Sequence, residues 1–399
     1  MGSGRQHRSV QLIPGALRLR LAVWYALAIG SLGALHPLLA SSLLRSGLDA
    51  AVVPLLLTAF PLGTLLAGPT LGRLADRSGR LDLLLRTTAV LSALAAAAFA
   101  LELPPAGLVV ALGALALFRA PLFPLVDALV VDLLGAERRR YGALRAWGSV
   151  AFIALVQIAG AWLVVEPRAP RILAAGCLAG CALLAFALPP PPADAAAALR
   201  VLPSRDGGNL SSLWLVATLI GCATAMYDFL FVVHIESIGG DARMAGVAIG
   251  AGVALEVAVM ATSPRWLPRL RPTRGIQLAA AAGVARWILS AALENPVQVA
   301  AVQVLHGLSF GVFWVSAIAL IGERTPARMR ASATGALLAT SAGVGPLLAM
   351  VLASGLLPRY GTRSLFIVAA FCGAGALIVA SRRLSLSATL PPSDTPANV

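Results

Sequence analysis

The chain has 399 residues, of which 59% are hydrophobic and 12% are charged, and its mean hydropathy is +0.86. These values exclude a chain built mainly of soluble domains and are typical of a helical protein that crosses a membrane many times. All 31 basic residues are Arg, and the formal net charge is +14. In such a chain this charge indicates basic loops at an anionic membrane surface, so nucleic acid is not an expected partner.

Twelve apolar stretches follow one another along the chain, and each is about long enough to cross the hydrocarbon core, which needs roughly 20 helical residues. Only hydrogen-bonded helices or closed barrels can make that crossing, so we predict an all-α membrane protein with twelve transmembrane helices. The predicted spans lie near residues 20–43, 50–72, 83–102, 105–133, 146–165, 171–189, 212–235, 244–264, 275–293, 296–322, 332–357 and 362–381.

The Arg residues lie mostly in every second loop between the predicted spans, for example at 138–140 and 265–274. Because basic loops stay on the cytoplasmic side, this predicts a multi-pass protein of the bacterial inner membrane with both termini in the cytoplasm. The four Cys residues fall in predicted helices and lack the spacing of a metal site or a redox pair. The sequence therefore predicts no cofactor and no metal.

A polar stretch rich in Pro, Gly and Ser divides the chain, and it reads PPPPADAAAALRVLPSRDGGNLSS. The halves echo each other weakly, since GAERRRYGALRAWGSV and GERTPARMRASATGAL occupy equivalent places after the fourth and tenth spans. Two parallel six-helix repeats around a midplane site are the major facilitator arrangement. The predicted domains are an N-terminal six-helix bundle at 1–190, a cytoplasmic linker at 191–211, a C-terminal six-helix bundle at 212–385 and a disordered tail at 386–399.

The stretch after the second predicted span reads GRLADRSGR. It resembles the signature loop between the second and third spans of the major facilitator superfamily. The resemblance implies a conformational latch, in which glycines permit close helix approach and ion pairs differ between two states. The latch residues would be Gly72, Asp76, Arg77, Gly79 and Arg80. The equivalent stretch of the second half, SPRWLPRLRPTR, keeps the Arg residues but has neither the Gly nor the Asp.

Two further stretches, YGALRAWGSVAFI at 141–153 and LHGLSFGVFW at 305–314, resemble the phenylpropionate permeases and, more distantly, the lactose permeases, which are proton symporters. The resemblance implies a substrate and proton site at the matching positions, which are Asp127, Arg145, Tyr227, Asp228, Glu256, Arg286 and His306. The chain departs from the lactose permeases at Gln303 and Ser309, where those proteins have Lys and Glu. Phe152 stands where their Trp stacks on the sugar, so a galactoside is not the expected substrate.

The charged residues inside the predicted spans indicate a functional site independently of the family resemblance. A charged side chain at the bilayer centre costs on the order of 2.5–3.5 kcal/mol, so it is kept only where it is paired, faces a cavity or is functional. Glu256 has no Arg within a turn of its own helix, and we expect Arg286 or His306 as its partner. Asp127 has Arg145 as its expected partner.

Two further polar residues in the N-terminal half are candidates for the site. Arg119, eight residues before Asp127 on one predicted helix, could neutralise Asp127 or hold an anionic substrate, and both alternatives stay open. His36, beside Pro37, could mark a kink that faces the cavity.

These observations predict a monomeric secondary transporter, not an enzyme, that moves a small molecule with protons across the lipid bilayer by alternating access. A buried carboxylate crosses apolar surroundings more easily when neutral, so it can carry the proton; Glu256 is the expected carrier, ahead of Asp228 and Asp127. A spare guanidinium at Arg119 favours an aromatic or other small organic acid, because Arg binds carboxylate through two parallel hydrogen bonds.

Three alternatives remain at this point. A sugar or nucleoside symporter would use the same architecture. A proton-antiport exporter of drugs or metabolites would usually carry GxxxGP in its fifth span, where GSVAFIALVQIAGAWL has no Pro. A polytopic membrane enzyme or receptor would add a soluble domain or place acidic and His clusters at the interface, whereas the loops here are short and mostly basic.

Overall fold

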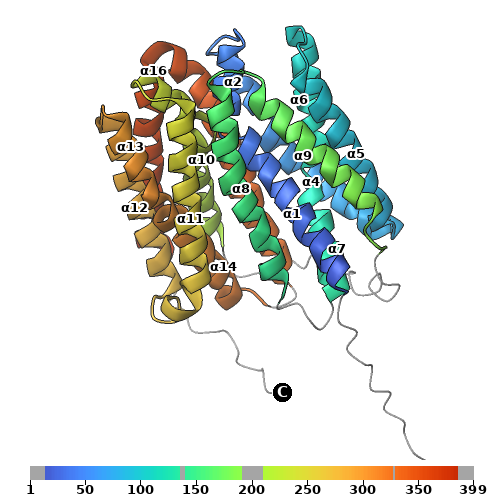
Figure 1. Ribbon diagram of the computed structural model, residues 1–399. Helices are drawn as coiled ribbons and strands as arrows, with labels where there is room; N and C mark the ends of the chain where they lie inside the picture. The colour runs from blue at the N-terminus through green and yellow to red at the C-terminus, as the bar shows by residue number, and fades with distance from the viewer. Residues whose placement is uncertain (1–13, 135–139, 191–209, 327–328, 385–399) are drawn as a thin grey trace, which may run out of the picture.

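The computed structural model describes residues 14–134, 140–190, 210–326 and 329–384, and this part of the chain is helical with no strand. The helices run roughly side by side, those of the first half at the right of Figure 1 and those of the second half at the left. The elements of the first half are α1 (Gly15–Leu35), α2 (Leu39–Arg45), α3 (Val52–Leu57), α4 (Ala59–Ser78), α5 (Leu81–Ala100), α6 (Pro105–Arg119), α7 (Leu122–Leu134), α8 (Tyr141–Leu163) and α9 (Ala169–Phe186).

The second half contains α-helices interrupted by short 3-10 and π-helical turns. Its elements are α10 (Ser211–Ser237), α11 (Ala242–Trp266), α12 (Pro272–Ala292), α13 (Pro296–Val302), η3 (Gln303–Leu305), η4 (Gly307–Gly311), α14 (Val312–Arg324), α15 (Arg330–Leu338), η6 (Ala339–Val344), α16 (Gly345–Val379) and η7 (Ala380–Leu384). The linker at 191–211 and the tail at 386–399 fall almost wholly outside the described residues.

Ten helical stretches of the described chain are long and apolar enough to cross a membrane. One of them, Ser332–Leu384, contains a kink at Gly361, where the backbone has φ 69° and ψ −176°. The shorter apolar helix Val52–Ala67 lies outside the ten. The surface carries many exposed apolar side chains, among them Val110, Leu183 and Phe371, each more than 70% exposed. Such a surface suits acyl chains and not water.

Two of the predicted spans break at a proline. The span expected at 20–43 breaks between Leu35 and Leu39, around Pro37, and the span expected at 105–133 breaks between Arg119 and Leu122, around Pro121. Proline has no N–H to donate and its ring crowds the preceding turn, which explains both breaks. The two pieces together still form one apolar helical stretch, Pro105–Leu134, which carries both Arg119 and Asp127.

The GRLADRSGR stretch was expected to be a loop and is mostly helix. Its first seven residues continue α4 to Ser78, and only Gly79 and Arg80 form the turn into α5. Gly79 has φ 64°, a left-handed conformation that glycine adopts without strain. The turn between these helices is therefore only two residues long.

Helices from the two halves of the chain meet at several places. In the first half α1 packs against α8 and α9, and in the second half α10 and α12 pack against α16. Between the halves, α8 contacts α11, α2 contacts α10, and α4 contacts η6. At the α8–α11 contact a Cβ on Gly160 would lie 2.6 Å from the carbonyl oxygen of Ala242, and one on Gly246 would lie 2.8 Å from that of Val156. Only glycine permits this approach of two backbones.

Candidate functional site

Two adjoining cavities, with volumes of about 290 and 520 Å³, lie between helices of the two halves. Both volumes fit small-molecule sites. Six residues line both cavities: His36, Ser149, Asp228, Phe229, Val253 and Glu256. The smaller cavity adds Phe152, Tyr227 and His306, and the larger one adds Arg145, Phe60, Phe310 and Trp314 among others. The walls are thus mainly apolar and aromatic, with a few charged groups.

Glu256, His306 and Arg286 form a hydrogen-bonded chain on the side of the second half. His306 Nε2 lies 3.1 Å from Glu256 Oε2, and Arg286 Nη1 lies 3.0 Å from His306 Nδ1. Arg286 is fully buried, while the Glu256 side chain is 18% exposed. His306, one of the two expected partners, therefore contacts Glu256 directly, and Arg286 reaches it only through the imidazole ring.

The chemistry of Arg fixes the proton on this imidazole. A guanidinium has donors only, so His306 Nδ1 must accept from Arg286. The remaining ring proton is then on Nε2, where it is donated to the carboxylate of Glu256. A second proton on Nδ1 would face the guanidinium donor. In this arrangement His306 is neutral, and Glu256 is the group of the pair that can take up a proton.

Irregular helical turns and two glycines position this pair. His306 lies between the 3-10 turn η3 and the π-turn η4, a kind of insertion that is frequent at functional sites. A Cβ on Gly307 would lie 2.7 Å from the backbone nitrogen of Glu256, and one on Gly252 would lie 2.9 Å from the carbonyl oxygen of Gln303. Because both glycines lack side chains, α11 approaches η3 and η4 closely enough for the hydrogen bond to form.

Arg286 is held by neutral partners. Its Nε donates to Gln303 Oε1 at 2.9 Å, and its guanidinium carbon lies 4.0 Å from the ring centre of Tyr227 and 4.2 Å from that of Trp287. Such cation–π contacts stabilise a desolvated cation by about 2 kcal/mol. Nη2 has no hydrogen-bond partner among the described residues. Gln303, a departure from the lactose permeases, thus serves here as an acceptor for Arg286.

A second Arg–His pair lies on the side of the first half. Arg119, only 6% exposed, places Nη1 3.1 Å from Nε2 of His36, at the break between α1 and α2. Since Arg can only donate, His36 Nε2 accepts and its proton is on Nδ1. Arg119 Nη2 has no partner among the described residues. The ring of His36 lines both cavities and lies 4.3 Å from that of Phe60 and 5.4 Å from that of Phe229.

Asp127 has a different hydrogen-bond partner from those expected. Its Oδ1 accepts from the hydroxyl of Tyr25 at 2.5 Å, across 102 residues of sequence. Arg119 bonds to His36 instead of Asp127. Arg145, on α8, lines the larger cavity. The pairs Asp127–Arg145 and Glu256–Arg286 are not among the ion pairs within 4.0 Å that the structure shows for the described residues.

Six of the expected site residues line the smaller cavity: His36, Phe152, Tyr227, Asp228, Glu256 and His306. Within the described ranges the carboxylate of Asp228 makes no hydrogen bond, and Asp228 lines both cavities, where that carboxylate is available to a ligand. Arg119, Asp127 and Arg286 lie behind the wall and line neither cavity.

Sequence reasoning missed Tyr25, Ser149 and Phe229. A Tyr inside an apolar span of a chain with only 6% aromatic residues was the one signal that could have pointed to Tyr25.

The described part of the expected latch is exposed. Arg77 and Arg80 lie on the surface at the end of α4 and the start of α5, and Gly79 makes the turn between them. The side chain of Asp76 lies outside what the structure describes, so the latch stays a prediction.

A polar contact joins the halves at the upper end of Figure 1, where α2 meets α10. Arg45 Nη2 lies 2.9 Å from Glu236 Oε1, and the hydroxyl of Ser41 donates to both carboxylate oxygens of Glu236 at 2.9 and 2.7 Å. We call these three residues the α2–α10 clasp. Together with the close α8–α11 contact, the clasp holds the halves together at this end.

An all-helical bundle with an apolar surface and a central cavity carrying buried charges is the architecture of a multi-pass membrane transporter. A family model, the MFS_1 like family, matches residues 18–368. The chain therefore belongs to this family of the major facilitator superfamily, whose members are transporters and not enzymes. The expected superfamily is thereby confirmed.

Two curated proteins and one solved structure extend this result. A maltose permease of Geobacillus stearothermophilus is 29% identical over 359 residues, which cover 88% of this chain and 90% of that protein. A probable 3-phenylpropionic acid transporter of Escherichia coli (strain K12) is 31% identical over 271 residues, 66% of this chain and 70% of that one. The crystal structure of a mutant of the nucleoside transporter NupG superposes with a TM-score of 0.80 at 17% identity. The match covers 92% of this chain and 99% of that one. The protein is a secondary transporter of small solutes.

Proposed function

We propose that this protein is a proton symporter for a small organic acid, with Glu256 as the proton carrier. The observation that supports this most directly is the chain Arg286–His306–Glu256 at the cavity wall. In that chain the imidazole is held neutral, and the carboxylate is the group that can bind and release a proton. Asp228, whose carboxylate also lines the cavity, is the second candidate carrier.

Coupling follows from the charges of the cavity. An anionic substrate that enters a cavity lined by Glu256 and Asp228 meets like charge unless a proton binds first. Once Glu256 is protonated, the substrate and the proton are bound together, and the loaded cavity is less costly to close against apolar surroundings. The proton and the acid therefore favour each other's binding, which is the requirement for symport.

The preference for an acid is supported by the first half of the site. Arg119 stands behind His36 with one guanidinium nitrogen unpartnered among the described residues, and it fixes the proton of His36 on Nδ1. A ring N–H backed by a buried positive charge favours a carboxylate. Phe60, Phe152 and Phe229 line the same cavities and suit an aromatic or aliphatic body. The probable 3-phenylpropionic acid transporter among the relatives fits this chemistry.

The transport cycle requires a topology, which we propose from the helices. Ten long apolar stretches become twelve crossings if Ser332–Leu384 crosses twice around Gly361 and if α3 and α4 together form one crossing. Two six-helix halves then enclose the cavity, with both termini in the cytoplasm of a bacterial inner membrane. In that orientation the α2–α10 clasp closes the external side.

A neutral sugar is the second candidate substrate. The maltose permease matches a larger share of this chain than the phenylpropionic acid transporter does. Two carboxylates in the cavity could also accept hydrogen bonds from sugar hydroxyls.

Ligand-induced changes in the melting temperature of the purified protein distinguish the two substrates. We expect 3-phenylpropionate and similar monocarboxylates to stabilise the protein, and Arg119→Gln to weaken their binding at least tenfold. The control is Arg363→Gln, which removes an exposed ion pair with Glu294. Stabilisation by maltose alone, or unchanged carboxylate affinity in Arg119→Gln, would contradict the proposal.

A further inference from the structure

A third hollow lies at the upper end of the first half and shares no lining residue with the two central cavities. Its volume is about 680 Å³. It is formed where the loops α2–α3, α5–α6 and α8–α9 meet, together with the adjoining ends of α3, α6 and α9. We call this hollow the upper groove.

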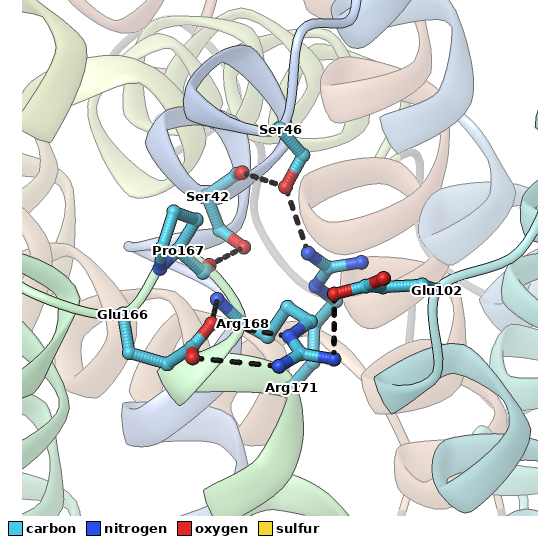
Figure 2. Close-up of polar contacts among 7 residues, drawn as sticks. All are labelled: Ser42, Ser46, Glu102, Glu166, Pro167, Arg168 and Arg171. Atoms are coloured by element: carbon cyan, nitrogen blue, oxygen red, sulfur yellow. Dashed lines mark hydrogen bonds and ion pairs between the residues drawn. The ribbon is translucent and has the colours of Figure 1, made fainter.

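Charged and polar side chains line part of the upper groove, and Figure 2 shows the hydrogen bonds and ion pairs among them. Arg168 Nη1 lies 3.0 Å from Glu102 Oε1, and Arg168 Nε donates to Glu166 Oε1 at 3.1 Å. The hydrogen bonds that Arg168 donates to Glu166 hold the pKa of Glu166 below its ordinary value, so Glu166 remains an anion at neutral pH. The charge of Arg168 is therefore balanced by two carboxylates of the protein itself.

Arg171 is different from Arg168 because it lacks an acidic hydrogen-bond partner. It is 3% exposed, and its Nη2 donates to the hydroxyl of Ser46 at 2.8 Å. Its Nε is buried and has no hydrogen-bond partner among the described residues. A desolvated guanidinium with a free donor is costly unless an acceptor joins it. Arg171 lines the groove, so its guanidinium, with no carboxylate bound to it, lies beside the space for an anionic ligand.

The walls of the groove are apolar and continue onto the surface of the bundle. Val52, Leu101 and Val109 line it and are 44%, 58% and 50% exposed. They belong to the apolar exterior that faces acyl chains in a membrane. At the rim, Asp49 and Glu102 are exposed acids. The groove thus combines a buried cation, acids at its mouth and an apolar flank.

We infer that the upper groove binds a zwitterionic phospholipid whose headgroup carries a primary ammonium. Arg171 takes the phosphate, and an acyl chain lies against Val52 and Val109. Asp49 and Glu102 take the ammonium, and Glu102 shares its carboxylate between the ammonium and Arg168. This order of charges excludes two other headgroups. A purely anionic headgroup meets the acids without a cation to offset them, and a choline headgroup has no N–H to donate to them.

Native mass spectrometry of the delipidated full-length protein in detergent tests this site. The probes are phosphatidylethanolamine, phosphatidylglycerol and phosphatidylcholine with identical acyl chains, and soluble phosphoethanolamine as the headgroup alone. We expect phosphatidylethanolamine to bind at least tenfold more tightly than the other two lipids. Arg171→Gln should lose that binding at least tenfold, while the control Arg363→Gln should keep it.

A second variant keeps the test decisive if Arg171→Gln does not fold. Asp49→Asn leaves the buried cation and the Arg168–Glu102 pair in place and should reduce the preference for phosphatidylethanolamine over phosphatidylcholine at least threefold. The inference is overturned by equal binding of the three lipids, by unchanged binding in a folded Arg171→Gln, or by an unchanged preference in Asp49→Asn. Displacement of the lipid by phosphoethanolamine at similar concentration would also overturn it, because the site would then recognise the soluble headgroup and not a membrane lipid.

Discussion

Replacing Gly307 by Ala tests whether close packing of η4 on α11 positions the Glu256–His306 pair. The added Cβ would lie 2.7 Å from the backbone nitrogen of Glu256 and 2.8 Å from the backbone carbon of Leu255, whereas ordinary contacts begin at 3.4 Å. Backbone atoms cannot rotate away, so the two elements must separate by about 0.7 Å. Overpacking of this kind costs about 1–3 kcal/mol.

Gly322 provides a matched control, because it is also helical and a Cβ there meets nothing within 4 Å. Gly322→Ala should be neutral or stabilising, since Ala is favoured over Gly in a helix by about 1 kcal/mol. We expect Gly307→Ala to lower the apparent melting temperature in detergent and to reduce uptake in proteoliposomes at least tenfold. Equal behaviour of the two Ala variants in both assays would refute the reasoning.

Three further predictions concern groups outside the cavity. Glu236→Gln removes the ion pair with Arg45, a contact worth about 0.2–1 kcal/mol. Labels on the loops after α2 and α10 should then show an open upper end about threefold more often, and an unchanged distance distribution would contradict the clasp. Asp76→Asn should slow transport and leave substrate affinity unchanged, because the latch lies far from the cavity; a loss of affinity at normal turnover would argue against a latch. The hydrogen bonds from Arg168 lower the pKa of Glu166 below 4.5. The contact between these two residues therefore stabilises the folded protein above pH 4.5, and this stabilisation is lost as the pH falls through the lowered pKa. The acid-induced fall in melting temperature should therefore be smaller in Glu166→Gln than in the unmodified protein.

Hydropathy predicted most of the long helices because the bilayer imposes their length. The span expected at 212–235 is helix α10, Ser211–Ser237, and the one expected at 244–264 is α11, Ala242–Trp266. A kink beside Pro37 was among the expectations, whereas the break at Pro121 was not predicted. Membrane helices often contain Pro, and an average over apolar residues carries no information on backbone angles.

The polar residues of the cavity were predictable as a set, because each is costly in an apolar span. Their partners were less so. His306 was one of two residues expected to contact Glu256, and the structure shows that it does. The pairs Arg119–His36 and Tyr25–Asp127 join residues 83 and 102 positions apart, and no local pattern relates them. Such contacts depend on how the helices pack, which the sequence of a single chain does not reveal.

Uphill accumulation by the Glu256→Gln variant is the most direct test of proton coupling. The protein is reconstituted in proteoliposomes, and an inwardly directed proton gradient is imposed. Uptake of labelled 3-phenylpropionate is then followed, and the control is Glu294→Gln, which replaces an exposed acid. The amide keeps the volume of Glu256 but cannot carry a proton. We expect the unmodified protein and the control to concentrate the acid, and Glu256→Gln to equilibrate it without accumulation. Accumulation by Glu256→Gln equal to that of the control would contradict the assignment of Glu256 as the proton carrier.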